Sequence, residues 1–354
     1  MRTKMKGILV GTLVLALIAG FSNGVQAASS PKPIELRVAS FLPEMDHQNI
    51  TAKKIFGEIE KQTGGKVRFV YFPGESLVKA KEAYEATVKG RCDIFNGIVP
   101  AYTPGRFPLT SLVDLAPNIQ YGEDASAAFW EFFNKYLKDE FKDIKILAAF
   151  VQVPQHIHAR VPVRNFSDIK GKQIRVYGAG KEIVEAWGGT PVFVSMSETY
   201  LSLQRGVVDG MLGPFNQMKP NRMSEVTSHH TIIGCLASPF LVGMNMDKFK
   251  SLPPDVQKVL DQMGESASRQ YGKSWDDDEL FNIEFLKKEG GHQFIILPPK
   301  ELAQWRKKAE SINEKYVAAL ESKGVPAKKV YAEKMKIWSK YLSREKPWAQ
   351  MLKK

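Results

Sequence analysis

Apolar positions along the chain follow two alternating patterns, and together they predict an α/β fold. Short apolar runs of roughly four to eight residues are typical of strands, whereas apolar residues spaced by three or four are typical of helices. The two patterns alternate from residue 34 to residue 213, which favours mostly parallel sheets covered by helices. Strands are expected at 36–40, 67–72, 93–98, 144–150, 157–161, 174–176, 191–194 and 207–212.

The helical segments are bounded by glycine and proline, and they dominate the last third of the chain. The strand at 157–161 alternates like an exposed edge strand, and His229-His230 is interpreted as a loop or helix end. A helix that begins at Pro253-Pro254 is expected to continue through residue 285, which would make it unusually long. The other helices are expected at 52–62, 83–89, 125–136, 181–187, 198–205, 302–320 and 329–341.

The first 27 residues have the pattern of a secretory signal peptide. Three basic residues precede the apolar run 8–21, and small residues ending in Ala27 follow it. The run has 14 residues, too few for an ordinary membrane span. We therefore expect cleavage after Ala27 and export to the periplasm.

The positive charge of the chain is concentrated near its C-terminus. The formal net charge is +12, and residues 281–354 carry 17 basic and 8 acidic residues. The simplest interpretation is a set of solvated lysine-rich helix faces; a docking surface or a weak attraction of anions are the alternatives. Nucleic acid is not an expected partner of an exported protein. Cys92 and Cys235 are isolated, which favours buried free thiols over a disulfide.

Arg175 is the most informative single residue. It stands among apolar residues in the strand expected at 174–176. An isolated buried guanidinium is costly, so such an arginine requires a fixed anionic partner. From the residues alone, that partner is either a structural carboxylate of the same chain or the carboxylate of a ligand held by two parallel hydrogen bonds.

The segment around Arg175 also carries a family resemblance. The stretches 167–176, 187–192 and 197–210 together resemble the core signature of the TRAP transporter periplasmic solute-binding proteins, the DctP family. The segments 56–67, 71–77, 89–93 and 251–260 resemble further parts of that family, so the resemblance covers nearly the whole mature chain.

The resemblance implies a two-lobe periplasmic-binding-protein fold with mixed sheets and a long helix spanning both lobes. Lobe I is expected at 34–152 plus 239–278, and lobe II at 153–238 plus 279–354. It implies a monomeric, cofactor-free receptor that closes by hinge motion and delivers its ligand to a membrane permease with a small and a large subunit. Transport would be driven by an ion gradient.

The resemblance also assigns roles to individual residues. An arginine at the place of Arg175 pairs with the ligand carboxylate in this family. Gly213 replaces an asparagine that holds the carboxylate in some members, and Gln155 falls where sialic-acid-binding members have a second arginine. We therefore expect a small organic acid with one anchoring carboxylate rather than sialic acid.

Five further positions are candidates for the cleft, each with a structural alternative. Met196 and Phe215 either cover the ligand or pack in the core, and Phe240 matches a position next to the hinge. His47 follows the first strand and Tyr102 follows the third, and loops after strand ends face the crevice in open α/β sheets. Asp46, beside His47, is better interpreted as a helix cap.

Other functions have weaker support in the sequence. His156 and His158 share a strand face, yet such pairs are more often core or surface residues than metal ligands, so no metal is expected. The chain has no Gly-x-Ser-x-Gly, His-Glu-x-x-His or phosphate-loop motif, which argues against an enzyme. A periplasmic sensor and a binding protein of an ATP-driven transporter are the remaining alternatives, because both share two-lobe closure.

Overall fold

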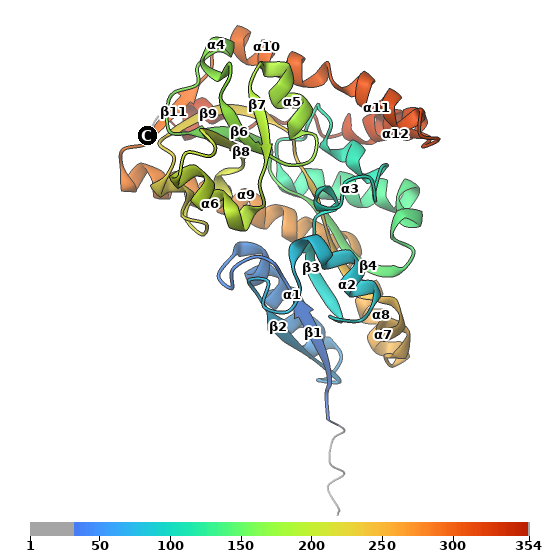
Figure 1. Ribbon diagram of the computed structural model, residues 1–354. Coiled ribbons are helices and arrows are strands. Elements are labelled where there is room, and N and C mark those ends of the chain that lie inside the picture. Colours follow the sequence, from blue (N-terminus) through green and yellow to red (C-terminus); the bar gives the residue numbers. More distant parts are fainter. Residues whose placement is uncertain (1–31, 353–354) are drawn as a thin grey trace, which may run out of the picture. The chain divides into compact units, whose positions relative to one another are not determined.

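Two mixed β-sheets organise the chain, whose computed structural model describes residues 32–352 (Figure 1). The first sheet has the strand order β2-β1-β3-β10-β4. Its strand β10 enters late in the sequence and runs antiparallel to both neighbours, whereas β1 is parallel to β2 and β3. The strands are β1 (Ile34–Ala39), β2 (Val67–Phe72), β3 (Ile94–Ile98), β4 (Ile144–Val151) and β10 (Pro239–Asn245).

The second sheet has the order β11-β9-β5-β8-β6-β7. Its strand β5 is antiparallel to β8 and β9, and the other pairs are parallel. The insertion of β5 and β10 makes both sheets mixed, so the alternation along the chain overstated their parallel character. The strands are β5 (Gln155–Ala159), β6 (Gln173–Val176), β7 (Thr190–Phe193), β8 (Gly210–Gly213), β9 (His229–Cys235) and β11 (Gln293–Ile296).

Helices cover both sheets, and their start points follow local capping chemistry. The Asp46 carboxylate accepts a hydrogen bond from Gln48 N and caps the first helix, as predicted. Ser195 and Glu198 form a reciprocal capping box at the start of α6. The helices are α1 (His47–Gln62), α2 (Ala83–Val88), α3 (Gly122–Tyr136), α4 (Phe166–Ile169), α5 (Gly180–Trp187), α6 (Met196–Gln204), α7 (Met246–Ser251), α8 (Pro254–Asp261), α9 (Gly264–Glu289), α10 (Pro299–Glu310), α11 (Asn313–Glu321), α12 (Ala327–Trp338) and α13 (Trp348–Met351).

Several predicted elements need correction. The strand expected at an exposed edge is β5, which lies in the middle of its sheet and is completely buried. In β5, buried histidines alternate with apolar residues. Because histidine counts as polar in a hydropathy pattern, the strand resembled one with a solvent-exposed face. His229-His230 begins the strand β9 and is no loop. The strands β9, β10 and β11 were not foreseen.

Two long helices of the C-terminal third are interrupted. The helix expected to begin at Pro253 ends at Asp261, and α9 begins at Gly264, whose φ of +34° turns the chain between them. The helix expected over 302–320 is divided into α10 and α11. The signal peptide predicted at 1–27 lies outside the described residues.

Helix α9 connects the cores of the two sheets. Its N-terminal half packs Tyr271 and Trp275 into the apolar cluster around the first sheet. Its C-terminal half places Ile283 and Leu286 in a cluster with residues of the second sheet's side, including Met211 of β8. The long helix expected to span both lobes is therefore α9 alone.

The two chain segments that cross between the sheets are paired with each other. Gln152 N donates to Ser238 O at 3.2 Å, and Gln155 N donates to Leu236 O at 3.0 Å. Helix α12 packs against α3, where Phe132 meets Trp338 edge to face. The C-terminal helix α12, predicted to belong to lobe II, thus contacts α3, which was predicted to belong to lobe I. The residue bounds of the two lobes remain a prediction.

Two lysines of the basic C-terminal segment are buried rather than solvated. Lys346 pairs with Asp276 and Glu279 of α9, and Lys334 donates to Leu115 O. Burial lowers the pKa of Lys334 to about 7. Cys92 and Cys235 are buried free thiols, as expected.

Helices α3 and α9 lie side by side (Figure 1) and approach so closely that only glycine fits at their contact. A Cβ at Gly272 would lie 2.2 Å from Gly122 O and 2.4 Å from Ser126 Oγ. We expect Gly272→Ala to lower the free energy of unfolding by about 3 kcal/mol, because rigid backbone must move. Gly57→Ala in α1, where a Cβ meets nothing within 4 Å, should instead raise it by about 0.5–1 kcal/mol. Urea unfolding of both variants measures the difference, and equal effects would contradict the packing argument.

Candidate functional site

The guanidinium of Arg175 is buried without an anionic partner. Arg175 lies on β6, in the interior of the second sheet, and its side chain is completely buried. Its Nε donates to Val194 O at 2.9 Å, but neither Nη1 nor Nη2 has a hydrogen-bond partner among the described residues. No ion pair joins it to a carboxylate in that part of the chain. The structural-carboxylate alternative therefore has no support in the described chain, and the two free nitrogens are suited to an external anion.

Aromatic rings surround this guanidinium. Its carbon lies 4.8 Å from the centre of the Tyr177 ring, and Tyr177 meets Tyr102 edge to face at 6.0 Å. The Tyr177 hydroxyl accepts hydrogen bonds from Nε2 of Gln152 and of Gln155, both at 2.9 Å. Burial raises the pKa of Tyr102, and the positive charge of Arg175 opposes that shift. The rings exclude water and strengthen any charge pairing at Arg175.

A cavity next to Tyr102 and Tyr177, the rings that contact Arg175, is lined by residues from the sides of both sheets, although Arg175 itself is not among them. Its volume of about 30 Å³ holds only one or two waters, so its walls must separate before an organic acid enters. Several lining polar atoms are buried and have no partner among the described residues, among them His47 Nε2, Gln48 Oε1, Gln217 Oε1 and Trp275 Nε1. The lining residues are Phe41, Leu42, Asp46, His47, Gln48, Val99, Tyr102, Gln152, Tyr177, Met196, Asn216, Gln217, Asn221, Phe240 and Trp275.

Unpartnered buried polar atoms are rare in folded proteins, so a group of them in one cavity indicates a binding site. His47 stacks edge to face on Trp275 at 4.6 Å, and Trp275 also contacts Phe240 at 5.6 Å. Burial lowers the pKa of His47 to about 3 and raises that of Asp46 to about 7. The His47 ring is therefore neutral at physiological pH.

Gly213 has no space for a side chain of its own. A Cβ there would lie 2.5 Å from Met211 Cε and 2.9 Å from Gln217 Oε1. The Gln217 carboxamide occupies the space beside Gly213 and lines the cavity. Phe215 is completely buried between His158 and Trp348, in the core behind the second sheet, and does not line the cavity.

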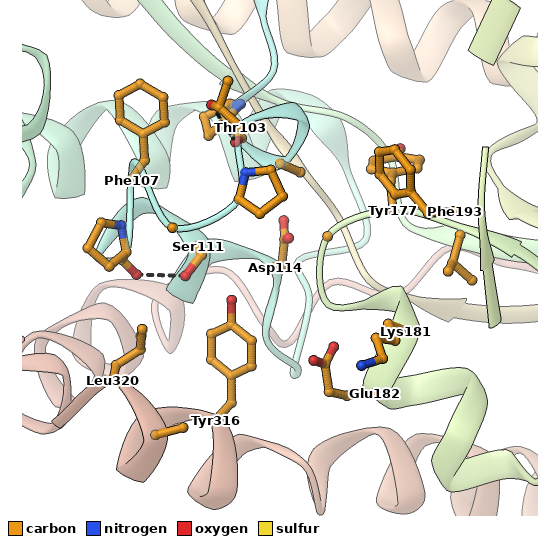
Figure 2. A pocket seen from close by; sticks show the side chains of 18 of the residues that line it. Thr103, Phe107, Ser111, Asp114, Tyr177, Lys181, Glu182, Phe193, Tyr316 and Leu320 are labelled. Carbon is orange, nitrogen blue, oxygen red and sulfur yellow. Dashed lines mark hydrogen bonds between the residues drawn. The ribbon is translucent and has the colours of Figure 1, made fainter. Parts of the chain in front are cut away.

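A larger cavity of about 590 Å³ is also lined by Tyr177 (Figure 2). Its buried polar centre is Asp114, whose Oδ2 accepts from Ala179 N at 3.4 Å and whose Oδ1 has no partner among the described residues. Burial raises the pKa of Asp114 to about 7. Lys181 and Lys323 also line this space, beside the carboxyls of Asp114 and Glu182, so its wall carries charges of both signs.

The structure brings together four of the predicted site residues around the cavity: His47, Tyr102, Met196 and Phe240. Arg175 lies against the rings of Tyr102 and Tyr177, and Gln155 contacts Tyr177. Gly213 and Phe215 are not brought to the cavity. Tyr177, Trp275, Gln152 and Gln217 were missed. Tyr177 could have been found, because it follows Arg175 by two residues and alternate side chains of an extended segment point to the same side.

His156 and His158 are core residues of β5 rather than a surface pair. His158 Nε2 donates to Gly213 O at 2.9 Å, and its Nδ1 lies 2.9 Å from Nδ1 of His230. His230 Nε2 in turn lies 3.1 Å from Nδ1 of His292. Both ring nitrogens of His158 and His230 are thus used in hydrogen bonds. Burial lowers the pKa of His158 to about 3 and that of His230 well below its ordinary value.

Comparison with known proteins gives consistent matches. The sequence model of the bacterial extracellular solute-binding protein family 7, DctP, matches residues 38–319. The 2,3-diketo-L-gulonate-binding periplasmic protein YiaO of Escherichia coli is 25% identical over 292 residues, covering 78% of this chain and 84% of YiaO. The C4-dicarboxylate-binding periplasmic protein DctP of Rhodobacter capsulatus is 24% identical over 331 residues, which cover 92% of this chain and 97% of that protein.

Solved structures show the same fold. A TRAP periplasmic solute-binding protein from Desulfovibrio salexigens is 31% identical and superimposes with a TM-score of 0.78, over 90% of this chain and 99% of that one. A marine metagenome TRAP solute-binding protein specific for aromatic acid ligands is 26% identical. It superimposes with a TM-score of 0.83, over 87% of this chain and 99% of that one. In the described part of the chain, no helix combines the length and the apolar character that a membrane span requires.

The buried histidines predict a specific pH dependence of stability. Because the folded-state pKa of His158 is depressed to about 3, the unfolded chain takes up a proton there below about pH 6.5 and the folded protein does not. As the pH falls from 7 to 5, His158 should therefore lower the free energy of unfolding by about 2 kcal/mol. Asp46 and Asp114 have raised pKa values in the folded protein, so they raise the free energy of unfolding as the pH falls over the same range.

The test is consequently a difference between variants. His158→Gln should unfold with a free energy that falls about 2 kcal/mol less than that of the wild type between pH 7 and pH 5, as measured by urea unfolding. Ile157→Val, on the same buried strand, removes no titrating group and should keep the wild-type pH dependence. An unchanged dependence in His158→Gln would contradict the neutral buried state of His158.

Proposed function

Because the chain belongs to the bacterial extracellular solute-binding protein family 7, the DctP family of TRAP-type receptors for small organic acids, we propose that it captures its ligand by a carboxylate–Arg175 salt bridge. Members of this family are transport receptors, not enzymes. The single observation that carries the proposal is the buried Arg175 guanidinium, whose Nη1 and Nη2 are unpartnered in the described chain. A ligand carboxylate would accept both hydrogen bonds in parallel.

The remaining walls favour a ligand body that is apolar or aromatic. Rings from both sheets line the cavity, among them Phe41, Tyr102, Phe240 and Trp275, and Met196 adds a flexible apolar side chain. No lysine or arginine is among the described residues that line the cavity, and the cation that contacts two of its rings is Arg175, which argues for one carboxylate rather than two. The 26% identical marine relative is described as specific for aromatic acids and was solved with metahydroxyphenylacetate, which supports an aromatic acid for this chain as well.

Delivery would follow the two-lobe scheme of the family. Export by the signal peptide at 1–27 places the receptor in the periplasm, where the lobes close on the acid. The closed form then presents its ligand to the small and large subunits of a TRAP permease. Closure about the paired crossing segments, Gln152 to Ser238 and Gln155 to Leu236, brings the walls of the cavity together.

The test is Arg175→Met in residues 28–354, refolded to remove any co-purified ligand. In the wild type, an acid at about 100 times its dissociation constant adds about 2.7 kcal/mol to stability and raises the melting temperature. We expect this shift to vanish in Arg175→Met for every acid of a panel that includes benzoate, phenylacetate, succinate and gluconate. Exposed Arg164→Met, in the same half of the chain, should retain it.

The stability of the ligand-free variant separates the two roles of Arg175. Removing one partner of a buried ion pair costs about 3–5 kcal/mol, whereas removing an unpaired charge does not. Ligand-free Arg175→Met should therefore melt no lower than the wild type. A large loss of stability, or an acid-induced shift that persists, would overturn the anchoring role.

A further inference from the structure

The cavity wall on the side of the first sheet carries a hydrogen-bond acceptor and a donor, and neither has a partner among the described residues. The acceptor is His47 Nε2, and the donor is Trp275 Nε1–H. The two rings are in edge-to-face contact, with centres 4.6 Å apart, and both residues line the cavity. These residues, which we call the His47–Trp275 pair, face the same cavity as the walls around Arg175.

The tautomer of His47 follows from the hydrogen bonds around it. The hydroxyl of Ser274 donates its one proton to Tyr271 O at 2.7 Å. Ser274 Oγ must then accept from His47 Nδ1, which lies 3.0 Å away, so the proton of the imidazole is on Nδ1. In the neutral ring, Nε2 is left with a lone pair and acts only as an acceptor.

This assignment restricts the group that can lie against the His47–Trp275 pair. A carboxylate or carbonyl oxygen would face the lone pair of His47 Nε2 and donates nothing to it. An ammonium group satisfies His47 but leaves Trp275 Nε1–H unpartnered, because it has no acceptor. A hydroxyl does both, since it donates one proton and accepts another, and it can take the place of a water that would otherwise satisfy the two atoms.

We propose that the ligand is a hydroxy acid whose hydroxyl donates to His47 Nε2 and accepts from Trp275 Nε1–H. The inference rests on the proposed function, because it takes Arg175 as the anchor of the carboxylate. A site built to hydrogen-bond a hydroxyl discriminates strongly against the analogue that lacks it, because its buried polar atoms are then left unpaired. His47 and Trp275 would thus select acids that carry a hydroxyl over those that lack it.

The experiment compares matched acids with and without a hydroxyl by isothermal titration calorimetry. The probes are benzoate against its three monohydroxy isomers, phenylacetate against mandelate and the three hydroxyphenylacetates, and butyrate against its hydroxy derivatives. In the wild type, at least one hydroxy acid should bind tenfold or more tightly than its parent. Equal affinities throughout, with the parents still binding, would overturn the inference and leave the proposed function intact. Failure of every acid to bind would overturn both.

Variants of the pair then test the mechanism. His47→Asn keeps a polar group near Ser274 but removes the acceptor at Nε2, whereas His47→Gln places a carboxamide near that position. The hydroxyl preference should fall at least fivefold in His47→Asn and in Trp275→Phe, and should be partly retained in His47→Gln. The hydroxyl preference is the ratio of the affinities for the hydroxy acid and the parent acid in the same variant, so a loss common to both acids cancels. A hydroxyl preference that survives both His47→Asn and Trp275→Phe would contradict the proposal.

Discussion

The close contact between α3 and α9 is the constraint on which the rest of the molecule depends. Gly122 and Gly272 let the two backbones touch, and Asp276 of α9 accepts hydrogen bonds from Gly122 N and Glu123 N, at 2.9 and 3.0 Å, at the start of α3. This contact fixes α9, which in turn places Trp275 in the cavity wall. One helix therefore joins the packing of the core to the geometry of the candidate site.

The candidate site gathers several unpaired buried polar atoms around one cavity. Many buried polar groups elsewhere form hydrogen bonds, as His158, His230 and His292 show, while the described residues also include isolated unpaired atoms such as Asn313 Oδ1. Around the cavity, Arg175, His47 and Trp275 each keep a buried atom that no other residue in the described part of the chain pairs with. A folded protein tolerates such desolvated groups where a ligand completes them, because the lost hydration is then compensated on binding.

Much of the architecture could be predicted from the chain itself. The strands β2, β3 and β6 and the helices α3 and α5 were placed to within a few residues, because each has a clear apolar period and a glycine or proline boundary. Arg175 was identified because a lone charge in an apolar strand is anomalous in any fold. The resemblance to the DctP family then gave the two-lobe architecture, which the solved relatives confirm.

What the sequence by itself determined is many of the local elements, the family and the lone charge of Arg175 in an apolar strand, since these depend on neighbours along the chain. Only the tertiary structure decided that β5 and β10 enter their sheets antiparallel, that Phe215 packs in the core, and that Gln217 occupies the space beside Gly213. It also decided the pairing of His47 with Trp275, which are more than two hundred residues apart. These facts depend on contacts between segments distant in sequence, and no periodicity along one segment encodes which distant segment will lie against it.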